Sequence, residues 1–78
     1  MKTPERIQIE PGICGGKPVI RGTRVAVAIV VGSLAAGMSF EEVAREYDLC
    51  DEDIRAALSY ASSVLSEESL HPLPARAA

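Results

Sequence analysis

The side chains that most often carry catalysis or metal binding are few and widely separated in this 78-residue sequence. Its two cysteines, Cys14 and Cys50, form no CxxC pair, and the single histidine, His71, lies among prolines near the C-terminus. A zinc site needs a cluster of such ligands at short spacing. No serine or cysteine has a plausible base beside it, and the paired acids fall where helices begin. We therefore expect no catalytic residue, no metal site and no cofactor, in a protein that is not an enzyme.

Positive charge is concentrated in the first third of the chain. Residues 1–24 carry a charge of +3 and residues 25–78 a charge of −6, within a net charge of −3. A polyanion would therefore bind to residues 1–24 in preference to the acidic remainder of the chain. The candidate DNA-binding residues are Lys17, Arg21, Arg24 and, in a later helix, Arg55. The alternative for Arg24 is an ion pair with acids of its own fold or of a second subunit.

The element that carries most of these cations is predicted to be a β-arm. Residues 6–10 alternate polar and apolar side chains, and Pro11-Gly12 ends the pattern. Gly15-Gly16 permits a turn with positive φ, and an extended run resumes at residues 17–20. Residues 1–24 are therefore expected to form an N-terminal β-arm or hairpin.

An uncharged apolar stretch follows, and we predict a helix over residues 25–36. Thr23 is a plausible N-cap, and Gly37 stands where a left-handed residue would end the helix. On one face small residues recur at every fourth position, namely Ala28, Gly32 and Ala36. Such a face lets another backbone approach closely. It indicates either tight packing within the chain or the seam of a dimer.

Two further helices are predicted. Ser39 and Glu42 match a capping box that opens a short helix to about residue 46. After a turn at 47–50, a longer amphipathic helix runs from 51 to about 68. This spacing is typical of a helix-turn-helix, and the alternative is an ordinary αα-hairpin.

Charge argues against DNA binding through the second helix of this pair. The helix opens with three acids, Asp51, Glu52 and Asp53. Carboxylates beside DNA phosphates oppose binding, because affinity for DNA comes largely from neutralising phosphate charge. The spacing therefore favours a DNA-binding motif, while the charge does not.

The expected fold class is mainly α: a small helix-turn-helix-like helical bundle with a short N-terminal β-arm or hairpin. Residues 25–68 form the helical domain, and residues 69–78 form a flexible C-terminal tail. A domain of this size buries only about 60% of the surface of its unfolded chain. We expect a marginally stable monomer, stabilised by homodimerisation. Residues 1–10 carry four charged side chains where a secretory signal needs an apolar core, so we expect a cytoplasmic protein with reduced cysteines. The apolar run at 25–36 is too short to cross a bilayer, so we expect no membrane partner.

The sequence also resembles a prokaryotic family, the domain of unknown function 433, over roughly residues 6–62. The specific part of the resemblance is GGKPVIRGTR at residues 15–24. Other shared segments are PGIC at 11–14, AGMS at 36–39, EEV at 41–43, EDIRAAL at 52–58 and YA at 60–61. Cys50 departs from the usual serine or threonine N-cap, which predicts a less securely capped helix.

The resemblance implies a β-arm followed by a helix-turn-helix-like bundle, and an antitoxin that binds and neutralises a PIN-like toxin, a metal-dependent ribonuclease. Operon autoregulation by binding operator DNA is a further expected role. The alternatives are a helix-turn-helix transcriptional regulator without a toxin, and a structural protein-interaction module.

The C-terminal segment, from about Leu65 to Ala78, is the predicted toxin-binding element. A segment that orders on binding can cover a large surface of its partner. Its apolar anchors are Leu65, Leu70 and Leu73, and Arg76 offers a guanidinium to an acidic metal site. Arg24 is a second candidate for reaching that acidic site. The alternative is a tail with no partner.

Overall fold

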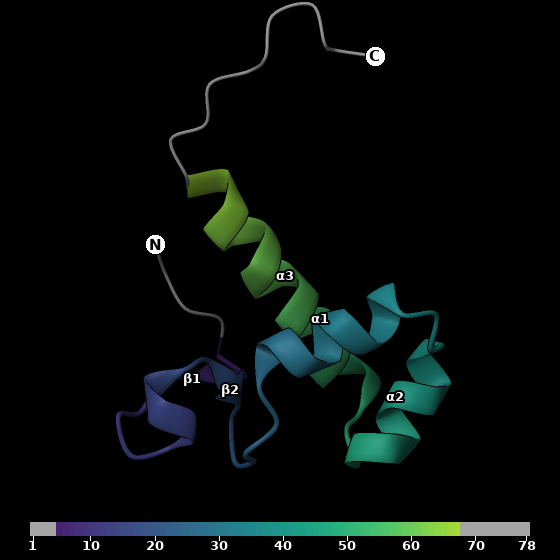
Figure 1. Ribbon diagram of the computed structural model, residues 1–78, viewed down its shortest axis with the longest axis horizontal. Coiled ribbons are helices and arrows are strands. Elements are labelled where there is room, and N and C mark those ends of the chain that lie inside the picture. Colours follow the sequence, from purple (N-terminus) through teal and green to yellow (C-terminus); the bar gives the residue numbers. More distant parts are fainter. Residues whose placement is uncertain (1–4, 68–78) are drawn as a thin grey trace, which may run out of the picture.

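The computed structural model describes residues 5–67 as a mainly helical fold with a small two-stranded sheet near the N-terminus (Figure 1). The fold class predicted from the sequence is confirmed. The elements, in chain order, are β1 (Ile7–Gln8), a 3-10 helix (Cys14–Gly16), β2 (Val19–Ile20), α1 (Val27–Ala35), α2 (Phe40–Tyr47) and α3 (Asp51–Glu67).

The predicted β-arm is an antiparallel hairpin with shorter strands than the sequence pattern suggested. Ile7 pairs with Ile20, and Gln8 pairs with Val19. The connection contains the 3-10 helix, in which Gly15 has a φ of 67°. That angle lies in the left-handed region that glycine adopts without strain.

Thr23 does not cap α1, so this prediction was wrong. Its hydroxyl donates to the carbonyl of Ile20 and accepts from the amide of Val25, which closes a turn after β2. The helix starts later, at Val27, with Ala26 as an N-cap that makes no side-chain hydrogen bond. The predicted end of the helix is confirmed, because Gly37 follows it with a φ of 109°.

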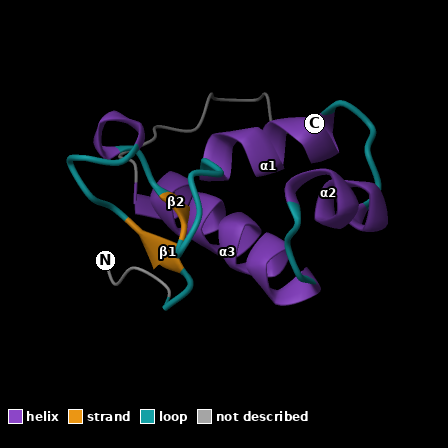
Figure 2. Cartoon of the chain, turned by 90° about the horizontal axis from the view of Figure 1, so that it is seen from below, coloured by secondary structure: helices purple, strands orange, loops and turns teal. Residues whose placement is uncertain are grey.

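The core forms where the hairpin, α1 and α2 all contact α3 (Figure 2). Both strands and all three α-helices contribute fully buried side chains, the largest being Ile7 of β1, Val19 and Ile20 of β2, Val30 of α1, Val43 of α2 and Ile54 of α3. Figure 1 shows α1 crossing α3, with α2 and the hairpin at opposite ends of the described domain. α3 is therefore the element against which the others pack.

α2 and α3 are joined by residues 48–50, as in the predicted helix-turn-helix. The capping box at the start of α2 is confirmed. The Ser39 hydroxyl accepts from the Glu42 amide at 3.0 Å, and a Glu42 carboxylate oxygen accepts from the Ser39 amide at 2.8 Å. At the far end Asp48 adopts φ 56°, which turns the chain towards the buried Leu49.

Candidate functional site

The side of α1 that faces away from α3 carries only apolar residues and glycine. This outer face of α1 consists of its exposed residues together with the exposed C-cap: Ala28, Ile29, Gly32, Ala35 and Ala36. The side chain of Ile29 is among the most exposed large apolar groups, at 48%. On α2, by contrast, the exposed side chains are charged: Glu41, Glu42, Arg45 and Glu46. The outer face of α1 therefore has the composition of an interior surface while facing solvent.

The small-residue stripe predicted from the sequence lies on this outer face. Ala28, Gly32 and Ala36 are all exposed. A Cβ atom built on Gly32 would meet nothing within 4 Å. Tight packing within the chain, one of the two interpretations of the stripe, is therefore wrong. The dimer seam, the other interpretation, stays a prediction.

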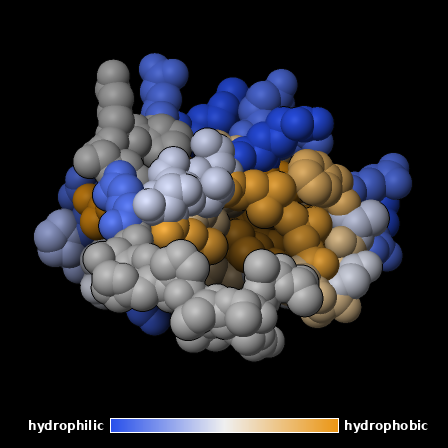
Figure 3. Space-filling model, turned by 90° about the horizontal axis from the view of Figure 1, so that it is seen from above, coloured by the Kyte–Doolittle hydropathy of each residue, from blue (hydrophilic) through white to orange (hydrophobic). Residues whose placement is uncertain are grey.

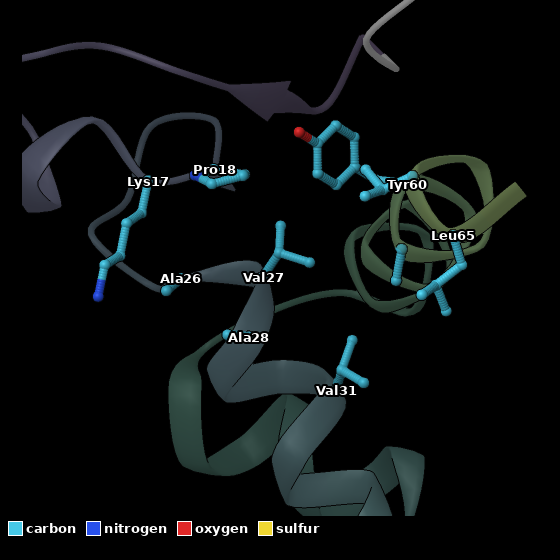
Figure 4. A pocket seen from close by; sticks show the side chains of 10 residues that line it. Lys17, Pro18, Ala26, Val27, Ala28, Val31, Tyr60 and Leu65 are labelled. Atoms are coloured by element: carbon cyan, nitrogen blue, oxygen red, sulfur yellow. The ribbon is translucent and has the colours of Figure 1, made fainter. Parts of the chain in front are cut away.

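A hollow of about 360 Å³ lies between α1 and the second half of α3 (Figure 4). Val27 and Val31 of α1 line one side, and Tyr60 and Leu65 of α3 line the other. Lys17 stands at its edge with its amine directed away from Tyr60. The predicted partner-binding residue Leu65 is thus on this hollow, with 60% of its surface exposed.

A second hollow of about 670 Å³ adjoins the first on the other side of the N-terminal half of α1. Both hollows are lined by Lys17, Ala26 and Ala28, so they form one continuous surface. We call this surface the α1 groove. Figure 3 shows apolar side chains gathered in a hollowed area on one face of the molecule, with hydrophilic side chains along its edge.

The charged side chains that line the α1 groove are both cations, Lys17 and Arg24. Neither the Lys17 amine nor the Arg24 guanidinium forms an ion pair or hydrogen bond with another residue in the range 5–67, although the Arg24 carbonyl accepts from the Cys14 thiol at 3.3 Å. The expectation that Arg24 pairs with acids of its own fold is not met by those residues. Two of the four predicted DNA-binding cations are therefore brought together beside α1.

The other two predicted DNA-binding cations, Arg21 and Arg55, make hydrogen bonds within the fold. Arg21 donates from Nε to the carbonyl of Glu5 at 2.7 Å and from Nη2 to that of Ile7 at 3.2 Å. Arg55 donates from Nε to Asp51 Oδ2 at 2.7 Å, a contact that raises the pKa of the guanidinium. Its guanidinium also lies over the ring of Phe40, 5.9 Å from the centroid. Among the described residues, two of the predicted DNA-binding cations thus have no side-chain partner and two are engaged within the fold.

The sequence did not reveal an ionic contact between the hairpin and the start of α3. Arg6 donates from Nη1 to Asp53 Oδ1 at 2.9 Å, and the backbone amide of Cys50 donates to Asp53 Oδ2 at 3.2 Å. Partial burial alone would raise the pKa of Asp53, but the hydrogen bonds from Cys50 and Arg6 outweigh it and lower the pKa below its usual value. Asp53 therefore satisfies the backbone amide just before α3, as the third residue of a capping box does.

Three of the predicted partner-binding residues lie outside the part of the chain that the structure describes. Leu70, Leu73 and Arg76 lie outside the described residues, as does His71. Among residues 5–67 no group of three or more histidine, cysteine or acidic side chains is arranged to hold a metal ion. Within the same range no helix is long and apolar enough to span a membrane.

One sequence relative and two solved structures are similar to this chain. The chain is 45% identical over 60 residues to the protein y4eO of Sinorhizobium fredii (strain NBRC 101917 / NGR234), covering 76% of this chain and 27% of y4eO. The crystal structure of a DUF433 member protein from Anabaena variabilis ATCC 29413 superposes with a TM-score of 0.73 at 36% identity, covering 80% of this chain and 62% of that one. The X-ray structure of Rv2018 from Mycobacterium tuberculosis gives a TM-score of 0.61 at 38% identity, covering 67% of this chain and 24% of Rv2018.

The chain thus spans less than two thirds of each of these three relatives. The model of the family described as "Protein of unknown function (DUF433)" matches residues 7–61. This match covers the hairpin, α1, α2 and most of α3. The chain belongs to the DUF433 family.

Proposed function

We propose that this chain is an antitoxin that binds and neutralises a PIN-like ribonuclease toxin, acting through protein contact rather than through catalysis. The toxin partner is what the family resemblance implies. The observation that carries the proposal is the apolar surface of α1, which is exposed over its outer face and continues into the α1 groove. Contiguous apolar surface of this kind marks sites of protein interaction.

The composition of this surface is that of a protein interface. α1 contains no charged residue from Val27 to Ala35. The centres of protein interfaces are depleted in charge and rich in apolar groups. The α1 groove adds concave apolar lining, into which a side chain of a partner can insert.

We further propose that the chain is a homodimer. The C-terminal half of the outer face of α1, formed by Gly32, Ala35 and Ala36, lines neither hollow. A second copy can pair there through its own α1, since small residues let two helix backbones approach closely. The α1 groove and the exposed Leu65 then remain available to the toxin.

The test is protection of cells that express the product of the neighbouring gene, which serves as the toxin in this assay. Leu65→Glu places a carboxylate on the edge of the groove at a well-exposed position. We expect this variant to lose protection while its circular dichroism stays that of the wild type. Ser62→Glu, which adds the same charge at an exposed position of the same helix, is the matched control and retains protection. Full protection by Leu65→Glu, or no protection by the wild type, contradicts the proposal.

Operator binding is the second candidate function, because α2 and α3 have the arrangement of a helix-turn-helix. The acids at the start of α3 oppose docking through that helix, so the DNA contacts are assigned to Lys17 and Arg24. Replacing either with alanine should weaken a mobility shift on operator DNA. It should also reduce the salt dependence by about one unit of slope per lost phosphate contact. A chain that binds only its second copy, and neither toxin nor DNA, is a structural interaction module.

A further inference from the structure

We propose that the α1 groove binds an acidic amphipathic segment of the partner protein, whose apolar side chains fill the hollows and whose carboxylates pair with Lys17 and Arg24. This inference rests on the proposed function and specifies the chemistry of the partner. It follows from the apolar character of the groove and from the sign of the charges at its edge.

The apolar part of the argument comes from the two walls of the groove. Val27 and Val31 face Tyr60 and Leu65 across the first hollow (Figure 4). On the other side of α1, the exposed Ile29 lines the second hollow. A partner segment that covers both hollows must present apolar side chains on one face to remove these groups from water.

The charges of the groove are all of one sign. Lys17 lines both hollows, Arg24 lines the second, and no acidic side chain lines either. The rest of the chain is acidic, with a net charge of −6 over residues 25–78. Because no described residue neutralises these two cations, carboxylates of a bound segment complement them, and charge complementarity of this kind selects the partner.

A nucleic acid fits this surface less well than a peptide does. Duplex binding relies on several phosphate contacts, whereas the groove offers two cations. The groove is lined largely by valine, alanine and isoleucine side chains, and phosphate groups placed against them would lose their hydration without gaining hydrogen bonds in return. A peptide with both apolar and acidic side chains satisfies both parts of the surface.

The experiment selects random peptides displayed on phage against the full chain, without any toxin. We expect enriched sequences that combine leucine, isoleucine or phenylalanine with aspartate or glutamate. The enriched peptide is then synthesised with its carboxylates intact and with the same carboxylates replaced by amides. Lys17→Glu and Arg24→Glu should each lower the affinity for the acidic peptide, about fivefold at low salt and less at high salt. The affinity for the amide peptide should be the same for wild type and for these two variants.

Arg45→Glu is the matched control, because Arg45 is an exposed cation of α2 that lines neither hollow. It should leave peptide affinity unchanged, and Leu65→Glu should reduce it. Enrichment without acidic residues, or equal affinity of Lys17→Glu and wild type, overturns the inference. A selection that enriches nothing, while DNA or a second copy binds through Lys17 and Arg24, also overturns it. If Leu65→Glu fails to protect cells from the toxin while both charge-reversal variants protect them, the proposed function stands and this inference fails.

Discussion

Replacing Asp53 with alanine removes the carboxylate that joins the start of α3 to the hairpin. The side chain is 17% exposed and accepts from the Cys50 amide and from Arg6. Loss of a helix-capping acceptor costs about 1 kcal/mol, and the contact with the half-exposed Arg6 adds little because water screens it. In a domain of this size that free energy lowers the melting temperature by roughly 4–8 °C. Thermal unfolding followed by circular dichroism measures the change.

The effect of Asp53→Ala should depend on pH with a defined sign. The pKa of Asp53 is lowered in the folded state, so its carboxylate stabilises the fold fully above the usual aspartate pKa. The difference in unfolding free energy between wild type and variant should shrink as the pH falls through the lowered folded-state pKa. Glu52→Ala, which removes the neighbouring exposed acid, is the control and should change stability by less than about 0.5 kcal/mol. Equal effects of the two variants, or a difference that persists unchanged in strong acid, would refute the reasoning.

Other parts of the structure make three further predictions. Ser39→Ala removes half of the capping box and should cost about 1 kcal/mol in urea unfolding, whereas Ser62→Ala on the exposed side of α3 should not destabilise the protein. A Cβ atom at Gly32 would meet nothing within 4 Å and the position is exposed, so Gly32→Leu should leave the fold intact and break the proposed dimer in analytical ultracentrifugation; a folded wild-type monomer at micromolar concentration would exclude that dimer. Truncation after Glu68 should preserve fold and dimer but abolish protection from the toxin, and retained protection would show that the α1 groove, or the β-arm beside it, suffices without the C-terminal segment.

The helices were predictable because their signals are local. The Ser39 capping box and the acids that open α3 act within one turn of their own helix. The start of α1 was misplaced because Thr23 forms a turn instead of a cap. A threonine before an apolar run serves either purpose, and the choice depends on the pairing of β2 with β1, which is not a local property.

Long-range contacts were the part that the sequence did not predict. Arg6 and Asp53 are 47 positions apart, and only the packing of the hairpin on α3 brings them together. The same limit applies to Arg21, which the sequence presents as a free cation and the fold uses to satisfy two hairpin carbonyls. Charge and spacing identify candidate residues for binding, but only the fold distinguishes engaged cations from free ones.

The exposure of α1 is the strongest argument that this domain acts with another molecule. A helix that is apolar on every side is stable in water only when both of its faces are covered. α3 and α2 cover one face of α1, with Val27 and Val30 buried there. The opposite face, which includes the half-exposed Ile29 and the open position at Gly32, is covered by no described element. A sequence that places no charged residue on this face has not adapted it to water, which supports the proposed binding of a second copy or a partner protein there.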